Sequence, residues 1–164
     1  MRVDFYISPN ERRKFAASCE AVIRNVDRGT KSATELACQD ILEESLRQVP
    51  RDTGTLASTA FYEVTRRTAL KGYIYQGVIG YAGLVGAGAG RDAYNPVSRR
   101  YASEYAVRVH EDLSAEHPNG GKAKFLEDPV RQYAGRFKRV ATTYWRWAIE
   151  TSNSGGTSFI PVVK

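Results

Sequence analysis

The stretch Tyr105–Pro129, YAVRVHEDLSAEHPNGGKAKFLEDP, is the part of the sequence on which the predicted fold depends. Its first residues, up to Asp112, alternate valine with charged side chains, which is the period of a half-buried strand. The segment Pro118–Gly121 then contains proline, asparagine and two glycines, the residues that accept turn geometry. The stretch therefore predicts a strand that ends near Asp112 and is followed by an exposed loop.

A long C-terminal helix is predicted from Phe125 to about Glu150. Asp128 is suited to cap its N-terminus and Pro129 to occupy its first position. Apolar residues recur with helical spacing, at Leu126, Val130, Tyr133, Phe137, Val140, Ala141, Tyr144 and Ala148. Trp145 lies off this stripe, which favours it for an exposed contact.

The N-terminal third is predicted to be helical after a short strand or arm at Met1–Ile7. Ser8 and Glu11 have the spacing of a capping box, and Gly29 can end the first helix in a left-handed cap. A second capping-box spacing at Ser32 and Glu35 starts a helix that ends before Pro50. The pattern predicts a helical hairpin or one broken helix. Cys19 and Cys38 lie among apolar residues of these predicted helices, and both are predicted to be buried free thiols.

Two strands and a long loop are predicted in the middle of the chain. Phe61–Thr65 and Gly72–Tyr81 alternate as strands do, and the residues between them can close a hairpin. The glycine-rich segment Ala82–Tyr101 has no clear period, so we expect a loop excursion over 82–104 that serves as a binding element.

These elements predict an α+β fold, in which N-terminal helices and a long C-terminal helix pack on a mainly antiparallel sheet. Residues 1–150 are expected to form a single domain, followed by a linker and an apolar arm over 151–164. The tail Ser158–Lys164, SFIPVVK, is too short to form a core, so we expect it to dock on this domain or on a neighbouring chain.

Composition and charge narrow the classes of protein. The chain has 164 residues, 42% of them hydrophobic, which is typical of globular proteins and not of disordered tails. The formal net charge of +6 favours acidic partners such as DNA, although many soluble domains carry similar charge. The sequence shows no secretory signal and no apolar run of membrane-spanning length, which predicts synthesis in the cytoplasm and no membrane partner.

The candidate chemical motifs favour no catalytic, cofactor or metal site. The run Gly86–Arg91, GAGAGR, lacks the lysine, the hydroxyl residue and the following helix that a phosphate loop needs. His110, Glu111 and His117 do not have the spacing of a metal site. Asp52 with Thr53 is more typical of a turn than of an acid and a nucleophile.

Two separated stretches resemble a known family. The first is VPRDTGTLAST at Val49–Thr59, and the second consists of YAVRVHEDL followed by KAKFLEDPV. They resemble the minor capsid and tail-completion proteins of long-tailed double-stranded DNA bacteriophages. The matching residues are Pro50, Asp52, Thr53, Gly54 and Leu56 in the first element, and Tyr105, Ala106, Val109, Glu111, Phe125, Leu126 and Pro129 in the second. The similarity covers roughly 33–141. The glycine-rich insertion and the apolar tail depart from the family's compact pattern.

The resemblance implies a structural virion protein without catalysis, made in the host cytoplasm and placed at the head–tail junction. It implies a homo-oligomeric ring, the neck or connector, that joins the DNA-filled head to the tail and contacts neighbouring connector and tail proteins. We expect the subunit interface to include Phe5, Tyr94, Arg99, Arg100, Tyr101, Trp145, Phe159, Ile160 and Val162. A DNA-facing or simply solvated polar face would carry Arg131, Arg136, Lys138 and Arg139. The alternative is a domain that binds nucleic acid without reading its sequence.

Overall fold

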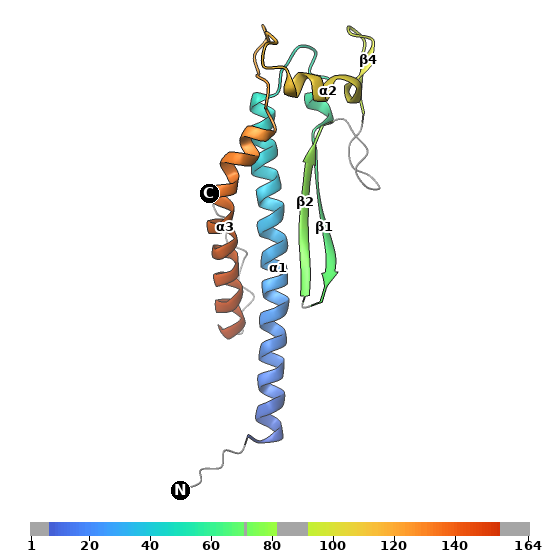
Figure 1. Ribbon diagram of the computed structural model, residues 1–164. Coiled ribbons are helices and arrows are strands. Elements are labelled where there is room, and N and C mark those ends of the chain that lie inside the picture. Colours follow the sequence, from blue (N-terminus) through green and yellow to red (C-terminus); the bar gives the residue numbers. More distant parts are fainter. Residues whose placement is uncertain (1–6, 71, 82–91, 155–164) are drawn as a thin grey trace. The chain divides into compact units, whose positions relative to one another are not determined.

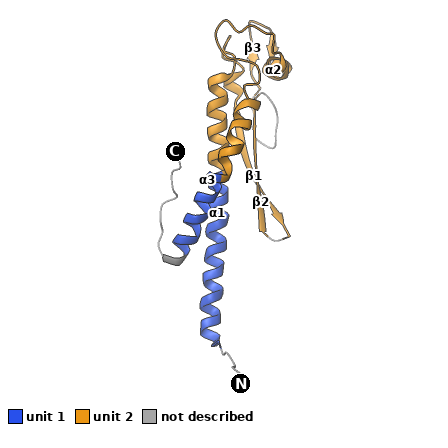
Figure 2. Cartoon of the chain, turned by 60° about the vertical axis from the view of Figure 1, so that its left-hand side comes forward, with its two compact units in different colours: residues 1–33, 139–164 blue, residues 34–138 orange. Residues whose placement is uncertain are grey.

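The computed structural model describes residues 7–70, 72–81 and 92–154 (Figure 1). The chain divides into two compact units, one of residues 1–33 with 139–164 and one of residues 34–138 (Figure 2). The single domain expected over 1–150 stays a prediction. The helices α1 (Pro9–Gln48) and α3 (Glu127–Ser154) each contribute residues to both units.

The helix α1 is continuous over 40 residues, so the predicted break or hairpin is wrong. Its predicted start is confirmed. The Glu11 amide donates to Ser8 Oγ at 3.2 Å, and the Ser8 amide donates to Glu11 Oε2 at 2.8 Å. Gly29 does not end the helix. It is buried, and a Cβ atom there would lie 3.2 Å from the Tyr144 carbonyl oxygen, so the glycine serves close helix packing.

In the first unit, α1 and α3 run antiparallel. The Asn25 side-chain amide donates to Ser152 Oγ at 2.9 Å, and Trp145 Nε1 donates to Thr30 Oγ1 at 3.0 Å. The helix α3 continues to Ser154, so the predicted linker at 151 begins too early. Residues 11–20 of α1 are all exposed, and Cys19, predicted to be buried, is among them.

The second unit contains a long β-hairpin beside α1. The strands β1 (Phe61–Ala69) and β2 (Gly72–Gly80) pair antiparallel in the predicted order, with a shorter connection than expected. Within this unit α1 lies between the hairpin and the start of α3 (Figure 1). A Cβ atom on Gly77 would lie 2.3 Å from the sulfur of Cys38, which is buried as predicted. Only glycine fits at this close approach.

The segment predicted as a strand from Tyr105 to Asp112 is a helix. The helix α2 spans Ala102–Glu111 and follows two short paired strands, β3 (Tyr94–Asn95) and β4 (Arg100–Tyr101). Its inward positions Ala102, Tyr105, Ala106 and Val109 have helical spacing and pack on the core. A strand would place Val107 on the same face as Tyr105 and Val109, but Val107 is 72% exposed. Tyr105 and Val109 lie on one face in a strand as well as in a helix, so the sequence pattern alone fits both structures. The packing of Ala102 and Ala106 on the core beside them shows that the segment is a helix.

The core of the second unit is formed by Val49, Leu56, Ala102 and Phe125. They bring together the end of α1, the turn before the short 3-10 helix η1 (Ala57–Thr59), the start of α2 and the segment before α3. Because α3 already begins at Glu127, Asp128 lies in its first turn and is not the cap that the sequence predicts.

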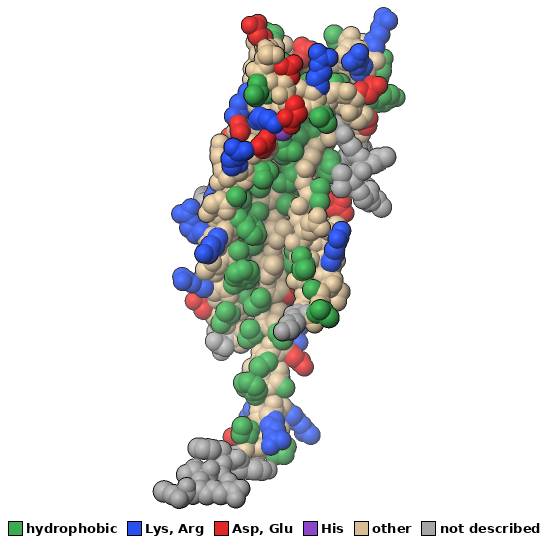
Figure 3. All heavy atoms as spheres, in the orientation of Figure 1, with side chains coloured by type: hydrophobic (Ala, Val, Ile, Leu, Met, Phe, Trp, Pro, Cys, Tyr) green, Lys and Arg blue, Asp and Glu red, His purple; other side chains and the backbone are tan. Residues whose placement is uncertain are grey.

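The predicted α+β class is confirmed, although the strands within the described residues form two separate two-stranded antiparallel sheets. Within the second unit, apolar side chains gather between the start of α3 and the hairpin (Figure 3). Among the described helices, none combines the length and the apolar character needed to cross a bilayer.

The contact between Gly77 and Cys38 can be tested by a pair of substitutions. We expect Gly77→Ala to lower the free energy of unfolding by about 1–3 kcal/mol, because the new methyl group overlaps the Cys38 sulfur. Adding Cys38→Ala should recover most of that loss, with Cys38→Ala alone as the control. Chemical denaturation measures all four proteins, and an equal penalty for Gly77→Ala in both backgrounds would contradict this contact.

Candidate functional site

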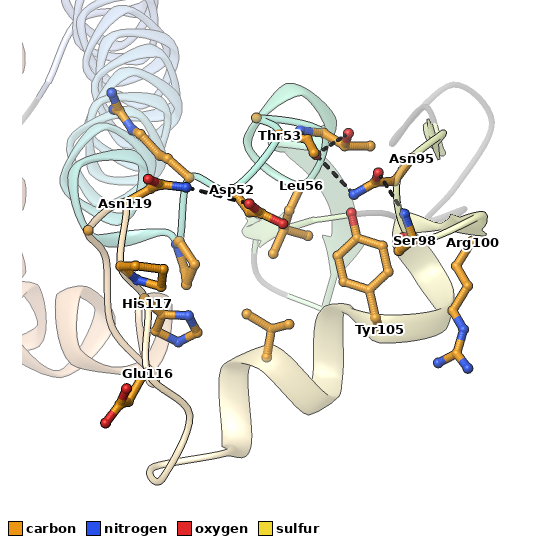
Figure 4. A pocket seen from close by; sticks show the side chains of 17 residues that line it. Asp52, Thr53, Leu56, Asn95, Ser98, Arg100, Tyr105, Glu116, His117 and Asn119 are labelled. Atoms are coloured by element: carbon orange, nitrogen blue, oxygen red, sulfur yellow. Dashed lines mark hydrogen bonds between the residues drawn. The ribbon is translucent and has the colours of Figure 1, made fainter.

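A cleft of about 500 Å³ opens in the second unit, between the end of α1, the β3–β4 hairpin, α2 and the loop before α3 (Figure 4). This volume lies within the roughly 300–1,000 Å³ range of protein binding sites. Both stretches that carry the family resemblance contribute to its lining. The lining residues are 50–56, Asn95, Ser98, Arg100, Tyr105, Val109 and 116–120.

Asn95 connects the two sides of the cleft. Its side-chain amide donates to Thr53 Oγ1 at 2.9 Å. Its Oδ1 atom accepts from the backbone amides of Val97 at 2.9 Å and Ser98 at 3.2 Å, which closes the turn between β3 and β4. Asn95 is 5% exposed, so these partners satisfy a buried polar group. The side chain thereby holds the hairpin against the Asp52–Gly54 turn.

The loop at 116–121 forms the opposite wall and lies against the end of α1. The Lys122 amide donates to the Gln48 carbonyl at 2.9 Å, and the Arg51 amide donates to the Gly120 carbonyl at 3.4 Å. Gly121 has a φ of 95°, and a Cβ atom there would lie 2.5 Å from Pro50 Cα. Both the backbone conformation and the close approach therefore require glycine.

The floor of the cleft mixes apolar and polar groups. Tyr105 projects from α2, with its hydroxyl pointing toward Thr53 and Asn95, and the His117 ring lies between Asp52 and Glu116 in the view (Figure 4). The His117 Nε2 atom is buried and has no hydrogen-bond partner in the described part of the chain. The ring nitrogen of His117 is therefore covered by the surrounding residues and is not presented to the open part of the cleft.

A charge cluster fixes the segment between α2 and α3. Lys124 has a φ of 57° and contacts Glu111 and Glu127, the second at 3.0 Å between Nζ and Oε2. The hydrogen bond from Lys124 lowers the pKa of both carboxyls, and the one to Glu111 raises the pKa of Lys124. Asp128, predicted as a cap, accepts from Lys122 Nζ at 2.5 Å, which lowers its pKa.

The Thr53 hydroxyl is held by other polar groups of the cleft. The Thr53 hydroxyl is 2.8 Å from the Thr55 hydroxyl and accepts from Asn95, and neither neighbour is a general base. Over residues 7–70, 72–81 and 92–154, no three His, Cys, Asp or Glu side chains are grouped to hold a metal ion. His110, considered as a ligand, instead packs its ring on Phe125, with centroids 5.0 Å apart.

Four predicted interface residues are brought together at the rim of the cleft. Tyr94 and Tyr101 are paired across β3 and β4, with ring centroids 5.3 Å apart, and both are about half exposed. Arg99 and Arg100 are exposed in the same hairpin, and Arg99 adopts a φ of 54°. Phe5, Phe159, Ile160, Val162 and the run at 86–91 lie outside the described residues.

Trp145 is 43% exposed and belongs to the first unit, in agreement with its predicted place off the stripe. Its indole nitrogen donates to Thr30 Oγ1, which holds the ring against α1. Trp147 is half-buried, and its Nε1 atom is buried without a partner in the described part of the molecule.

The four basic residues predicted for a polar face have different surroundings. Arg131 is 2.6 Å from Glu127, and Arg136 is 3.7 Å from Asp40 and lies over the Tyr133 ring. Lys138 and Arg139 are exposed. The helix spacing distributes all four over roughly 160° of the α3 surface, so they do not form a narrow stripe.

Sequence reasoning missed Asn95, although a signal was present. Asn-Pro dipeptides favour turn initiation, and Asn95-Pro96 lies inside the segment predicted as a loop excursion. It also missed the inward face of α2, because valine alternation dominated the interpretation of that stretch.

Comparisons with protein-family models, curated proteins and solved structures give no match to this chain.

Asn95 provides a test of the cleft's organisation. We expect Asn95→Ala to lower the free energy of unfolding by about 1–3 kcal/mol, because a buried side chain loses its hydrogen bonds to Thr53 and to two backbone amides. Asn95→Asp keeps that acceptor and should cost less. Thermal unfolding and amide exchange at Val97 and Ser98 measure the difference. An Asn95→Ala protein with unchanged stability and exchange would show that this side chain does not hold the hairpin.

Proposed function

We propose that this protein is a structural subunit of the bacteriophage neck, which assembles as a ring and helps to join the DNA-filled head to the tail. The observation that carries the assembly part of the proposal is the exposed apolar row on α1. Phe15, Cys19 and Ile23 have i, i+4 spacing and therefore share one helix face, and Phe15 is 72% exposed. Apolar rows of this kind are typical of surfaces that are covered in an assembly.

The cleft and its rim supply a second surface of the same type. Tyrosine and arginine are enriched at protein interfaces, and the β3–β4 hairpin exposes two residues of each kind. Since this hairpin and the α1 row are different surfaces, contact between one and the other would be heterologous. Heterologous contacts generate rings when the rotation closes, which suits a neck subunit.

The family resemblance supports the virion role specifically. Its two stretches are separated by the hairpin in sequence, yet Leu56 from the first packs in one core with Phe125 from the second. Residues of the two matched stretches thus meet in one core. Their contribution is to the core and to the cleft, where the contacts are structural.

The alternative, nucleic-acid binding without sequence readout, draws on the net charge of +6. This alternative is weakened by the pairing of Arg131 and Arg136 with carboxylates. An arginine that is already paired neutralises a DNA phosphate less effectively, so fewer counterions leave the DNA. A monomer that shifts short duplex DNA with steep salt dependence would favour this alternative over the neck.

The experiment measures oligomer formation by sedimentation velocity and mass photometry over a range of protein concentrations. We expect discrete oligomers, and we expect Arg100→Glu to raise their dissociation constant at least about tenfold, or about 1.4 kcal/mol. Arg67→Glu makes the same charge change on an exposed position of β1 and is the matched control. The assembly proposal fails if the wild type stays monomeric and is absent from particles, or if both variants behave alike.

A further inference from the structure

In the first unit, α1 carries an apolar seam that is covered along only part of its length. The buried part includes Gly29, where an added Cβ atom would lie 3.2 Å from the Tyr144 carbonyl oxygen on α3. Further toward the N-terminus the seam is first half-buried and then exposed at Cys19 and Phe15. Its members alternate in spacing between four and three residues, which places them on one helix face: Phe15, Cys19, Val22, Val26, Gly29 and Ala33.

The described part of α3 ends where the seam becomes exposed. The Asn25 side-chain amide donates to Ser152 Oγ at 2.9 Å, so the last turn of α3 lies beside Asn25. Because the two helices run antiparallel, the C-terminal end of α3 points toward Cys19 and Phe15 (Figure 2). Both helix segments belong to the first unit. The chain that follows Ser154 therefore starts beside the uncovered part of the seam.

We infer that the chain's own C-terminal segment Phe159–Val163 covers this part of the seam in the free subunit. The segment, FIPVV, has four large apolar side chains in five residues and no charge. Contact with the seam would remove apolar surface of both partners from water. The first unit has one other stretch outside the described residues, Met1–Tyr6, which fits less well because Arg2 and Asp4 interrupt its apolar residues.

The segment is long enough to reach the seam within one chain. Ser154 lies two residues beyond Ser152, so the remaining distance along α1 to Phe15 is about 12 Å at 1.5 Å per residue. Packed helix axes lie about 8–10 Å apart, which gives a combined distance of about 15 Å. Phe159 follows Ser154 by five residues, which span up to about 17 Å when extended.

A segment of the same chain has an advantage over one from a neighbouring copy. Through a connection of only a few residues, its effective concentration at the seam is in the millimolar range. A neighbouring subunit must therefore displace it to reach Phe15 and Cys19. The inference rests on the proposed function, which assigns the same row of α1 to assembly. The subunit would hide this row until a neighbour takes the place of the tail.

The two native cysteines report on the contact, because Cys19 lies on the seam and Cys38 is buried in the second unit. The full chain is treated with iodoacetamide at a concentration where the monomer predominates, and peptide mass spectrometry follows the alkylation of each cysteine. We expect Phe159→Ser combined with Ile160→Ser to raise the rate at Cys19 at least about fivefold, because the thiol becomes accessible. Thr157→Ser is the control and should leave this rate unchanged. Slow alkylation of Cys38 shows that each variant stays folded.

A disulfide tests the position of the segment. With Ile160→Cys in the full chain, oxidation by diamide should join the introduced cysteine to Cys19 within one chain. We expect Phe15→Ser to lower the yield of this link at least about fivefold, because the segment loses an apolar partner. Ala17→Ser is the matched control, since position 17 is exposed on nearly the opposite side of α1.

Equal alkylation rates at Cys19 in the wild type and the double variant would overturn the inference. A link that joins two chains, or one that Phe15→Ser leaves unchanged, would overturn it as well.

Sedimentation velocity separates this inference from the proposed function. If the tail competes with assembly, the double variant should self-associate at least about threefold more tightly than the wild type. Oligomers that form although Cys19 reacts equally fast in both proteins would refute the tail assignment and leave the ring intact. A double variant with a reactive Cys19 and no self-association would contradict both the competition and the proposed function.

Discussion

The packing of Phe125 is the constraint on which the second unit depends. Its side chain is 2% exposed and meets the Tyr81 ring edge-on at 5.1 Å and the His110 ring at 5.0 Å. These contacts join the residue after β2, the end of α2 and the segment before α3. Tyr81 is itself within hydrogen-bonding distance of Ser45 on α1, at 2.8 Å, and burial raises the pKa of the tyrosine. Phe125 thus packs directly against the residue after β2 and against α2, and it is linked to α1 through Tyr81.

This packing also sets the position of the surfaces that we assign to assembly. With Phe125 fixed, the loop at 116–121 lies against Pro50, and the start of α2 carries the β3–β4 hairpin to the rim of the cleft. Large apolar and aromatic groups then remain on the outside, on α1 as well as on the hairpin. A fold that uses its interior for joining elements and leaves aromatic groups outside is suited to binding copies of itself and neighbouring proteins.

The sequence predicted those elements whose pattern fits only one structure. Local hydrogen bonding and a single hydrophobic period specify three elements that the sequence predicted correctly. They are the capping box at Ser8, the β1–β2 hairpin and the long C-terminal helix. The stretch around Val107 was misread because valine alternation is compatible with a strand, whereas burial of Ala102 and Val109 in the shared core requires a helix. Gly29 was misread for a related reason: a glycine can end a helix or let another helix approach, and only the partner at Tyr144 distinguishes the two. The cleft was beyond local patterns, since Thr53 and Asn95 meet across 42 residues.

The central claim is that the chain works by shape and contact within a phage particle. Immunogold electron microscopy of finished particles, combined with mass spectrometry of their proteins, tests it most directly. The account predicts label at the junction of head and tail and several copies of the chain in each particle. Finished particles that lack the chain, or label confined to another part of the particle, would contradict it.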